Sequence, residues 1–470
     1  METVIGGRPA ASGLDRLVGL FTVVRDGESP TALLLTLNVF LLLTAYYVIK
    51  PVREALILAA NGAEVKSYAA AGQALLLLAL VPAYGALADR LPRRKLLNAV
   101  TGFFAVCLLL FYLLARASVP VGIVFFLWVG IFNLMIVAQF WSFANDLYTR
   151  EQGERLFPIV AFGASLGAVL GSGVTGLLIP VLGVPQLLLV AAVLLLAAAV
   201  CGNLADARER ARCEAGIPAR FTTEKLPAAT GEYLVQGSGD DQKVTVSLTG
   251  TSNRRGTFRL VFRERYLLLI ALLILVLNWV NTTGEYLLGR TVAMTAEAAV
   301  AAGTAGGLSV TEYIGRFYSE FFFAVNLLGL ALQLFVVSRL FKYFGVRVAV
   351  LVLPVIALVG YSLLAFLPVL AVVRWVKTAE NATDYSLQNT VRNVLFLPTT
   401  REQKYKAKQA IDSFFVRAGD VLSALLIFVG TTRLGLGPTG FARVNLVLAC
   451  IWVVLAILVG RGYAGKVAPE

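Results

Sequence analysis

Basic and aromatic residues stand at helical spacing inside the first long apolar run of the sequence. Tyr46, Lys50 and Arg53 occupy positions i, i+4 and i+7, so they share one face of a helix. Glu54 comes next, and Pro51 is expected to bend the helix at this place. Arginine offers phosphate two parallel donors, and lysine adds a compact positive charge. The pattern therefore predicts a site for a multiply charged anion such as a phosphorylated compound.

Three later apolar runs also carry polar and ionisable side chains. In the run near residue 276, Asn278, Thr282 and Glu285 share a face. The run near residue 381 is the most polar one, and its polar residues recur at steps of three and four: Arg374, Lys377, Asn381, Asp384, Gln388 and Arg392, with Glu380 alongside. The run near residue 422 contributes Asp412, Arg417 and Asp420.

Charges at the centre of a membrane helix cost roughly 2.5–3.5 kcal/mol each, so they normally face a cavity or a partner. We expect the substrate contacts of these runs to line one central cavity: Tyr46, Lys50, Arg53, Glu285, Lys377, Asp384 and Arg392. In this arrangement the cations bind phosphate, and Glu285 and Asp384 balance charge or carry a proton. The alternative is ion pairing that only holds helices together, as between Glu54 and Lys50 or Asp384 and Lys377.

The composition indicates which class of protein can hold these residues. Of the 470 residues, 58% are hydrophobic and 15% are charged, which is more apolar surface than a soluble fold can bury. The sequence has no histidine, and its four cysteines are scattered without a metal-binding or disulfide pattern. It also has no P-loop motif for ATP hydrolysis. We therefore predict an integral membrane protein that is not an enzyme and has no metal or cofactor.

Twelve stretches are apolar enough to cross a bilayer, which takes about 20 residues as a helix. They are centred near residues 42, 77, 106, 132, 168, 193, 276, 326, 357, 381, 422 and 450. The count predicts an all-α fold of twelve transmembrane helices in two six-helix pseudo-repeats. A series of glycines in the fifth stretch predicts a close-packing helix face rather than a phosphate cradle: Gly163, Gly167, Gly171 and Gly173.

The connecting segments predict the orientation and the division of the chain. Most of the 41 Lys and Arg residues fall in alternate segments, which indicates that both termini are cytoplasmic. The segment 205–265 is the one long polar stretch between apolar runs. We expect a cytoplasmic N-terminal segment, a first half, a cytoplasmic linker, a second half and a cytoplasmic tail: 1–31, 32–204, 205–265, 266–461 and 462–470.

A charged loop follows the second apolar run. Residues 85–95 read GALADRLPRRK, and the equivalent place after the eighth run reads SRLFKYFGVR at 338–347. The first stretch resembles the loop motif of the major facilitator superfamily, a Gly followed by Asp-Arg and a basic pair, with Pro92 in place of the usual Gly. The resemblance implies a conformational switch at Asp89, Arg90 and Arg93. Paired six-helix repeats also suggest alternating access around a midplane site.

Six further segments, taken together, resemble the ATP/ADP translocases of plastids and obligate intracellular bacteria and their relatives in free-living bacteria. They are residues 46–54 (YYVIKPVRE), 140–145 (FWSFAN), 154–158 (ERLFP), 281–286 (NTTGEY), 384–387 (DYSL) and 404–412 (KYKAKQAID). The resemblance runs along most of residues 35–460 and implies nucleotide exchange across a membrane. By this resemblance, Arg53 matches a family lysine and Lys50 its basic neighbour. Glu285 matches an acid of helix seven, and Lys406 or Lys408 matches a basic position before helix eleven.

Two departures from the family pattern change the charge of the expected site. Helix four has no acid between Arg116 and Asp146, where the better-known exchangers carry one. Asp384 stands where the family has the lysine of its Lys-Tyr-Ser-Leu segment. The expected fold does not depend on these positions. The exchange of ATP for ADP does depend on them, because they change the charge balance of the site.

The sequence thus favours a secondary transporter that works by alternating access on an anionic, phosphorylated or nucleotide substrate. Two alternatives remain open. One is a proton-coupled transporter of another organic anion or small metabolite, in which Glu285 or Asp384 carries the proton. The other is a non-transporting membrane scaffold that interacts through residues 205–265. The expected partners are a small anion such as ATP or ADP and membrane lipid, without nucleic acid, and we expect a monomer in the bacterial cell inner membrane.

Overall fold

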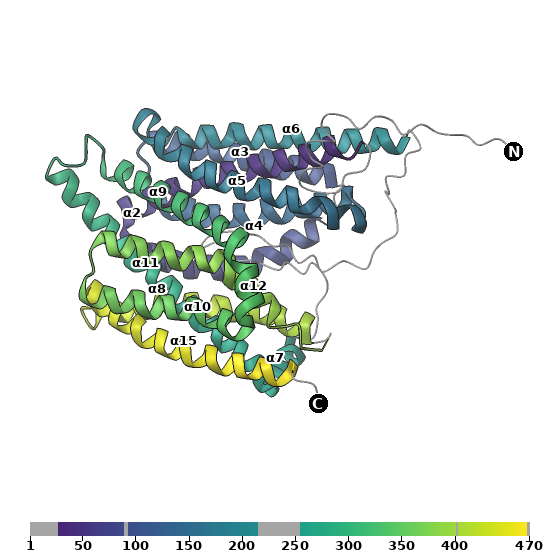
Figure 1. Cartoon of the computed structure of the whole chain (residues 1–470). Coiled ribbons are helices and arrows are strands. Elements are labelled where there is room, and N and C mark those ends of the chain that lie inside the picture. Colours follow the sequence, from purple (N-terminus) through teal and green to yellow (C-terminus); the bar gives the residue numbers. More distant parts are fainter. Residues whose placement is uncertain (1–26, 89–92, 215–253, 401–402, 468–470) are drawn as a thin grey trace.

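The computed structural model describes residues 27–88, 93–214, 254–400 and 403–467, and these residues fold almost wholly into helices (Figure 1). The α-helices are α2 (Ser29–Ala88), α3 (Arg93–Arg116), α4 (Gly122–Leu147), α5 (Arg150–Leu182), α6 (Leu187–Glu214), α7 (Arg254–Arg263), α8 (Arg265–Ala301), α9 (Val310–Leu332), α10 (Ser338–Phe366), α11 (Leu370–Thr383), α12 (Asn389–Val394), α13 (Lys408–Ala410), α14 (Val416–Thr432) and α15 (Pro438–Val467). Short π-helical segments are η1 (Gln333–Val337), η2 (Asp384–Gln388), η3 (Gln403–Ala407) and η4 (Ile411–Phe415). No residue within these ranges lies in a strand, so the all-α prediction is confirmed.

The described helices are consistent with the twelve expected spans. Nine stretches of the described residues are long and apolar enough to cross a membrane. Two of them, Ser29–Leu77 and Val310–Phe366, each contain two helices, because the chain turns at Gly62 and Gly345 with φ of 80° and 70°. Glycine adopts these angles without the steric cost of a Cβ atom. The polar helix formed by α11, η2 and α12 comes in addition to the nine.

The helices form two bundles that lie side by side (Figure 1). In the first bundle α2 packs against α4, α5 and α6, and α3 packs against α6. In the second bundle α15 packs against α8 and α10, and α14 packs against α8. This arrangement agrees with two halves, whose residue boundaries stay a prediction. α6 runs on as a helix to Glu214, beyond its expected end near residue 204.

The two bundles contact each other toward one end of the molecule. The start of α2 and the end of α6 lie at the opposite end (Figure 1). Ser319 Oγ of α9 donates to the carbonyl oxygen of Ser172 of α5 at 2.5 Å. Asn326 Nδ2 of α9 donates to the carbonyl oxygen of Ala168 at 3.2 Å. Figure 1 shows the bundles diverging toward the other end, where α6 ends and α7 begins. We call this other end the linker end.

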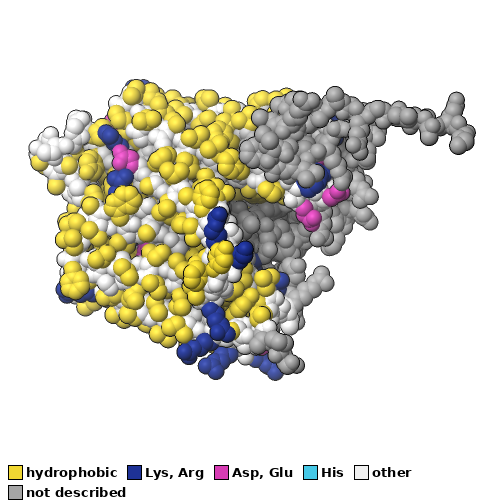
Figure 2. Space-filling view, viewed as in Figure 1, with side chains coloured by type: hydrophobic (Ala, Val, Ile, Leu, Met, Phe, Trp, Pro, Cys, Tyr) yellow, Lys and Arg dark blue, Asp and Glu magenta, His cyan; other side chains and the backbone are white. Residues whose placement is uncertain are grey.

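Apolar side chains cover much of the coloured, described part of the face in Figure 2. Large apolar residues are exposed on many helices, among them Phe103 at 60%, Leu177 at 75% and Trp375 at 65%. Lys and Arg side chains in this view gather toward the linker end (Figure 2). An outer surface of this kind suits contact with lipid chains, so the chain is a multi-pass integral membrane protein, as predicted.

Glycines bring α5 against the backbone of α2. A Cβ atom on Gly163 would lie 2.8 Å from the carbonyl oxygen of Thr36, and one on Gly171 would lie 2.8 Å from that of Thr44. Between them, a Cβ atom on Gly167 would overlap with the carbonyl oxygen of Phe40. Small residues allow helix backbones to approach closely in membranes. The predicted close-packing face is therefore confirmed.

Replacing Gly167 by alanine should destabilise the first bundle, because the new methyl group meets backbone that cannot move without separating α2 from α5. Overpacking of this kind costs about 1–3 kcal/mol of unfolding free energy. We expect the Gly167→Ala protein in detergent to show a lower thermal unfolding midpoint than the parent. The matched control is Gly102→Ala on α3, where a Cβ atom would meet nothing within 4 Å. Equal midpoints for the two variants would contradict the packing account.

Candidate functional site

α2 places three cations and one carboxylate in the interior of the molecule. Lys50 and Arg53 are 1% exposed, and Lys66, which follows the turn at Gly62, is 4% exposed. Glu54 Oε1 lies 2.6 Å from Arg53 Nη2, and Glu54 Oε2 lies 2.7 Å from Lys66 Nζ. These four residues are the α2 cluster. Three positive charges in it meet one negative charge, which gives a net charge of +2 when all are ionised.

Aromatic rings from both bundles contact the α2 cluster. The guanidinium carbon of Arg53 lies 4.8 Å from the ring centre of Phe126 on α4. Lys50 Nζ lies 4.3 Å from the ring centre of Phe322 on α9. Such cation–π contacts stabilise a cation that has lost its water shell. Because α4 belongs to the first bundle and α9 to the second, the α2 cluster lies between the halves.

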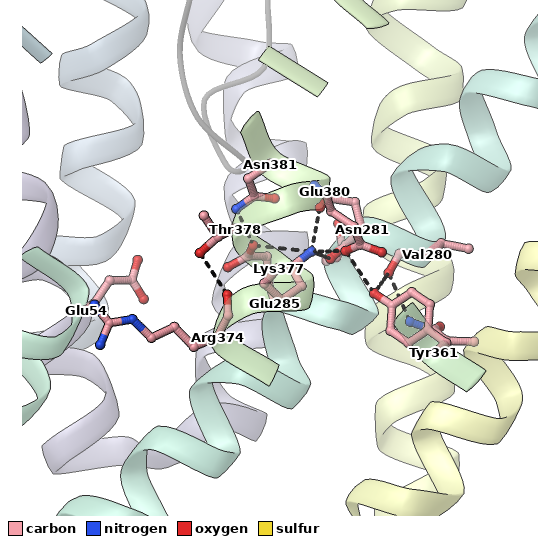
Figure 3. Close-up of polar contacts among 12 residues, drawn as sticks. Glu54, Val280, Asn281, Glu285, Tyr361, Arg374, Lys377, Thr378, Glu380 and Asn381 are labelled. Atoms are coloured by element: carbon pink, nitrogen blue, oxygen red, sulfur yellow. Dashed lines mark hydrogen bonds and ion pairs between the residues drawn. The ribbon is translucent and has the colours of Figure 1, made fainter. Parts of the chain in front are cut away.

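A second buried group joins α8 to α11 (Figure 3). Lys377 Nζ lies 2.8 Å from Glu380 Oε2 and 3.5 Å from Glu285 Oε1. Lys377 also donates to Asn281 Oδ1 at 2.8 Å, and Asn381 Nδ2 donates to Glu285 Oε1 at 3.0 Å. Lys377 is 0% exposed, Glu285 7% and Glu380 4%. Lys377, Glu285 and Glu380 form the α8–α11 triad, in which two negative charges share one positive charge, a net charge of −1 when all are ionised.

The two groups interact across the boundary between the halves. Glu285 of the triad is close enough to Lys66 and Glu54 of the α2 cluster to interact electrostatically with both. α2 also packs directly against α8. Charges interact more strongly in the interior than in water, because the local dielectric constant is lower. The site therefore has a cationic side on the first half and an acidic side on the second half.

Two other predicted site residues have partners outside these two groups. Arg392 Nη2 pairs with Asp412 Oδ1 at 2.5 Å, and Lys408 Nζ donates to Asn393 Oδ1 at 3.0 Å. Asp384 is half-buried in η2. The ion pairs place predicted residues in the α2 cluster, the triad and the Arg392–Asp412 pair. That these residues line one cavity stays a prediction.

Some predicted residues fall outside the part of the chain that the structure describes. Asp89 and Arg90 belong to residues 89–92, and the side chains of Arg93 and Lys406 are likewise outside the described set. The conformational switch in this loop therefore stays a prediction. Tyr46 is 2% exposed, and the centre of its ring lies 5.9 Å from Lys50 Nζ, so it lies next to the α2 cluster as expected.

Sequence reasoning did not assign a role to Lys66, Glu380 or Tyr361. Lys66 comes back to Glu54 only because the chain reverses at Gly62, and no local spacing reveals this contact. Glu380 follows Lys377 by three positions in a polar helix, which is a readable signal for an ion pair. Tyr361 comes from α10 and donates to Glu380 Oε2 at 3.2 Å, a contact that only the tertiary fold creates.

A smaller polar group joins the halves at the end away from the linker. Tyr286 Oη of α8 donates to Glu64 Oε1 of α2 at 2.8 Å. Arg290 Nη1 donates to Tyr286 Oη at 2.7 Å and lies 3.7 Å from Glu64 Oε1. We call this group the Glu64–Arg290 latch. It ties the first half to the second where the bundles are in contact.

Comparison with known families decides what kind of protein has this fold. The family model described as Major Facilitator Superfamily matches residues 33–397. The chain belongs to the Major Facilitator Superfamily. It is therefore a secondary membrane transporter, and the superfamily predicted from the charged loop after the second apolar run is confirmed.

Solved structures share the facilitator fold at low sequence identity. A bacterial homologue of the human lysosomal transporter Spinster, inward-facing and unoccupied, is 14% identical with a TM-score of 0.57, over 95% of this chain and 100% of that chain. The nucleoside transporter NupG is 13% identical with a TM-score of 0.58, over 94% and 100%. An auto-inhibited peptide transporter of the POT family is 11% identical with a TM-score of 0.59, over 94% and 98%. A comparison with curated proteins finds no match.

Reversing the charge of Arg290 should open the latched end of this facilitator, because Arg290→Glu places two carboxylates together. A half-exposed ion pair contributes at most about 1 kcal/mol, so we expect roughly a fivefold shift in population. The measurement is the distance between spin labels at Val119 and Thr304, exposed residues of the two halves, in a protein freed of its four cysteines. The label distance should lengthen.

The swapped double variant, Glu64→Arg with Arg290→Glu, is the control for this prediction. It restores the opposite charges and should return the label distance to the parent value. A distance that is unchanged in Arg290→Glu would show that the latch does not hold this end closed.

Proposed function

We propose that this transporter exchanges an anionic, phosphorylated solute of the nucleotide type, such as ATP against ADP. The observation that supports the proposal is the net charge of +2 on the α2 cluster, which is buried between the halves. Several buried cations around one carboxylate favour the approach of further negative charge. A phosphate group carries roughly two negative charges at neutral pH and would balance the cluster.

Arg53 is the residue best suited to hold a phosphate group. Its guanidinium is paired with Glu54, and phosphate oxygens can replace the carboxylate in the same two-pronged geometry. Lys50 and Lys66 add charge from either side of Arg53 along α2. Tyr46 and Tyr47, whose ring centres lie 5.1 Å apart, offer flat faces to a nucleotide base.

Further basic residues of the second half provide a path between this site and the linker end. Lys377 pairs with Glu285, which interacts with the α2 cluster, whereas Arg392 and Lys408 belong to α12 and α13. Asp384 lies in η2, between α11 and α12 along the chain, and we expect its negative charge to moderate the positive charge of this helix. In alternating access, release of the Glu64–Arg290 latch opens one end while the Asp89–Arg93 loop clamps the other.

We place the linker end in the cytoplasm of a bacterial cell, with both termini there and the helices in the inner membrane. Lys and Arg side chains gather at this end (Figure 2), as the positive-inside rule requires. The resemblance of residues 46–54 and 281–286 to the ATP/ADP translocases supports a nucleotide substrate. Asp384, where that family has a lysine, is the position at which the exchange partner or the coupling is expected to differ.

Uptake into proteoliposomes tests the proposal. Purified protein should take up labelled ATP with saturation, and internal ADP should accelerate this uptake. Replacing Arg53 by alanine removes the two-pronged donor, so we expect at least a tenfold rise in the half-saturating ATP concentration, equivalent to about 1.4 kcal/mol. The matched control is Arg316→Ala, an arginine of α9 whose side chain is 51% exposed, and this variant should behave like the parent.

Absence of saturable ATP or ADP uptake, with and without a nucleotide inside the vesicles, would overturn the nucleotide proposal. Saturable uptake of a different organic anion in the same vesicles would favour the second candidate, a transporter of another small anionic metabolite. The charge of the α2 cluster suits either anion, and the response to internal ADP separates them.

A further inference from the structure

We infer that Glu380 is the residue at which this transporter takes up and releases a coupling proton, on its Oε1 atom. This inference rests on the transport function proposed above and adds the ion that accompanies the solute. The sequence points to Glu285 and Asp384 for such a role, whereas the geometry points to their neighbour on α11.

The two oxygens of Glu380 have different surroundings. Oε2 accepts from Lys377 Nζ at 2.8 Å and from Tyr361 Oη at 3.2 Å. Oε1 is buried and has no hydrogen-bond partner among the residues that the structure describes. A buried carboxylate oxygen without a donor is unfavourable, and a proton bound to that oxygen removes its negative charge.

Within the triad alone, the charge count leaves room for one proton. The groups that face Glu380 are Lys377 of its own helix, Glu285 of α8 and Tyr361 of α10. With both carboxylates ionised, the triad carries one negative charge in excess, and one proton makes it neutral. Asn381, which is 1% exposed, also presents an Oδ1 atom that has no partner in the described part of the chain, so this region lacks donors rather than acceptors.

A proton fits this place better than a metal cation does. The ammonium group of Lys377 lies 2.8 Å from Glu380 Oε2 and 3.5 Å from Glu285 Oε1, so a sodium ion bound between the two carboxylates would meet a positive charge at close range. A proton on Oε1 binds on the side of the carboxylate away from the atom that Lys377 holds. It therefore adds no new repulsion.

Protonation of Glu380 should favour the binding of an anion at the α2 cluster. Lys377 then has one carboxylate fewer to balance, and more of its positive charge acts on Glu285 and on the solute. Glu285 is in electrostatic range of Lys66 and Glu54, so the charge of the triad acts on the cluster across the boundary between the halves. Proton and anion thus bind with positive cooperativity, so a proton can accompany the anion through the transport cycle.

Infrared spectroscopy of the full chain in lipid tests the proton site without any solute. The parent protein should show a carbonyl band of a buried protonated carboxyl group that disappears as the pH is raised. The band should be absent in Glu380→Gln and present in Glu320→Gln, an exposed glutamate of α9. In Glu285→Gln the Lys377–Glu380 pair is neutral without a proton, so the band should disappear at a lower pH than in the parent. Persistence of the band in Glu380→Gln, or its absence at every pH in Glu285→Gln alone, would overturn the assignment.

A transport measurement follows the proton itself. With ATP as the probe outside proteoliposomes, a pH dye inside should record proton entry for the parent and for Glu320→Gln. In Glu380→Gln the dye signal should fall to that of protein-free vesicles, although glutamine is neutral and isosteric and should preserve the fold. Proton entry at the parental rate in Glu380→Gln would refute the inference. If the parent does not take up ATP, the nucleotide proposal fails and the infrared result alone decides the proton site.

Discussion

A charge inside a membrane protein must be balanced by another charge or by hydrogen bonds. In this transporter, the Glu54 carboxylate balances buried cations of α2. One carboxylate contacts Arg53 at 2.6 Å and Lys66 at 2.7 Å, with Lys50 on the same helix and all four side chains buried. Removing one partner of such a buried network costs about 3–5 kcal/mol. In the function proposed above, the three cations around Glu54 attract an anionic solute.

The same requirement explains why the halves meet where they do. The first half contributes the cations and the second half the acidic triad around Lys377, so the two halves attract each other at the site. Glycines of α5 allow α2 to lie close enough to carry the cluster between the bundles. The Glu64–Arg290 latch is a weaker, half-exposed contact at one end, which suits a connection that must break in each transport cycle.

Sequence patterns predict the parts of this structure that depend on local chemistry. Apolar run length predicts the helices. Four-residue spacing predicts that Tyr46 and Lys50 lie together, and the structure shows this contact, with Arg53 also buried. Long-range partners are not readable in this way. Lys66 reaches Glu54 through a reversal at a glycine, and the triad depends on how α8, α10 and α11 pack together. Sequence spacing does not reveal these long-range ion pairs for the same reason, and the one common cavity stays a prediction.

The central claim is that the buried cations of α2 bind the phosphate groups of the solute. A structure of the transporter determined with bound ATP by electron cryomicroscopy tests this claim most directly. The account predicts phosphate density within hydrogen-bonding distance of Arg53 and of Lys50 or Lys66, with the Glu54 carboxylate displaced from the guanidinium. ATP bound elsewhere, with the Arg53–Glu54 pair still at the 2.6 Å seen here, would contradict it.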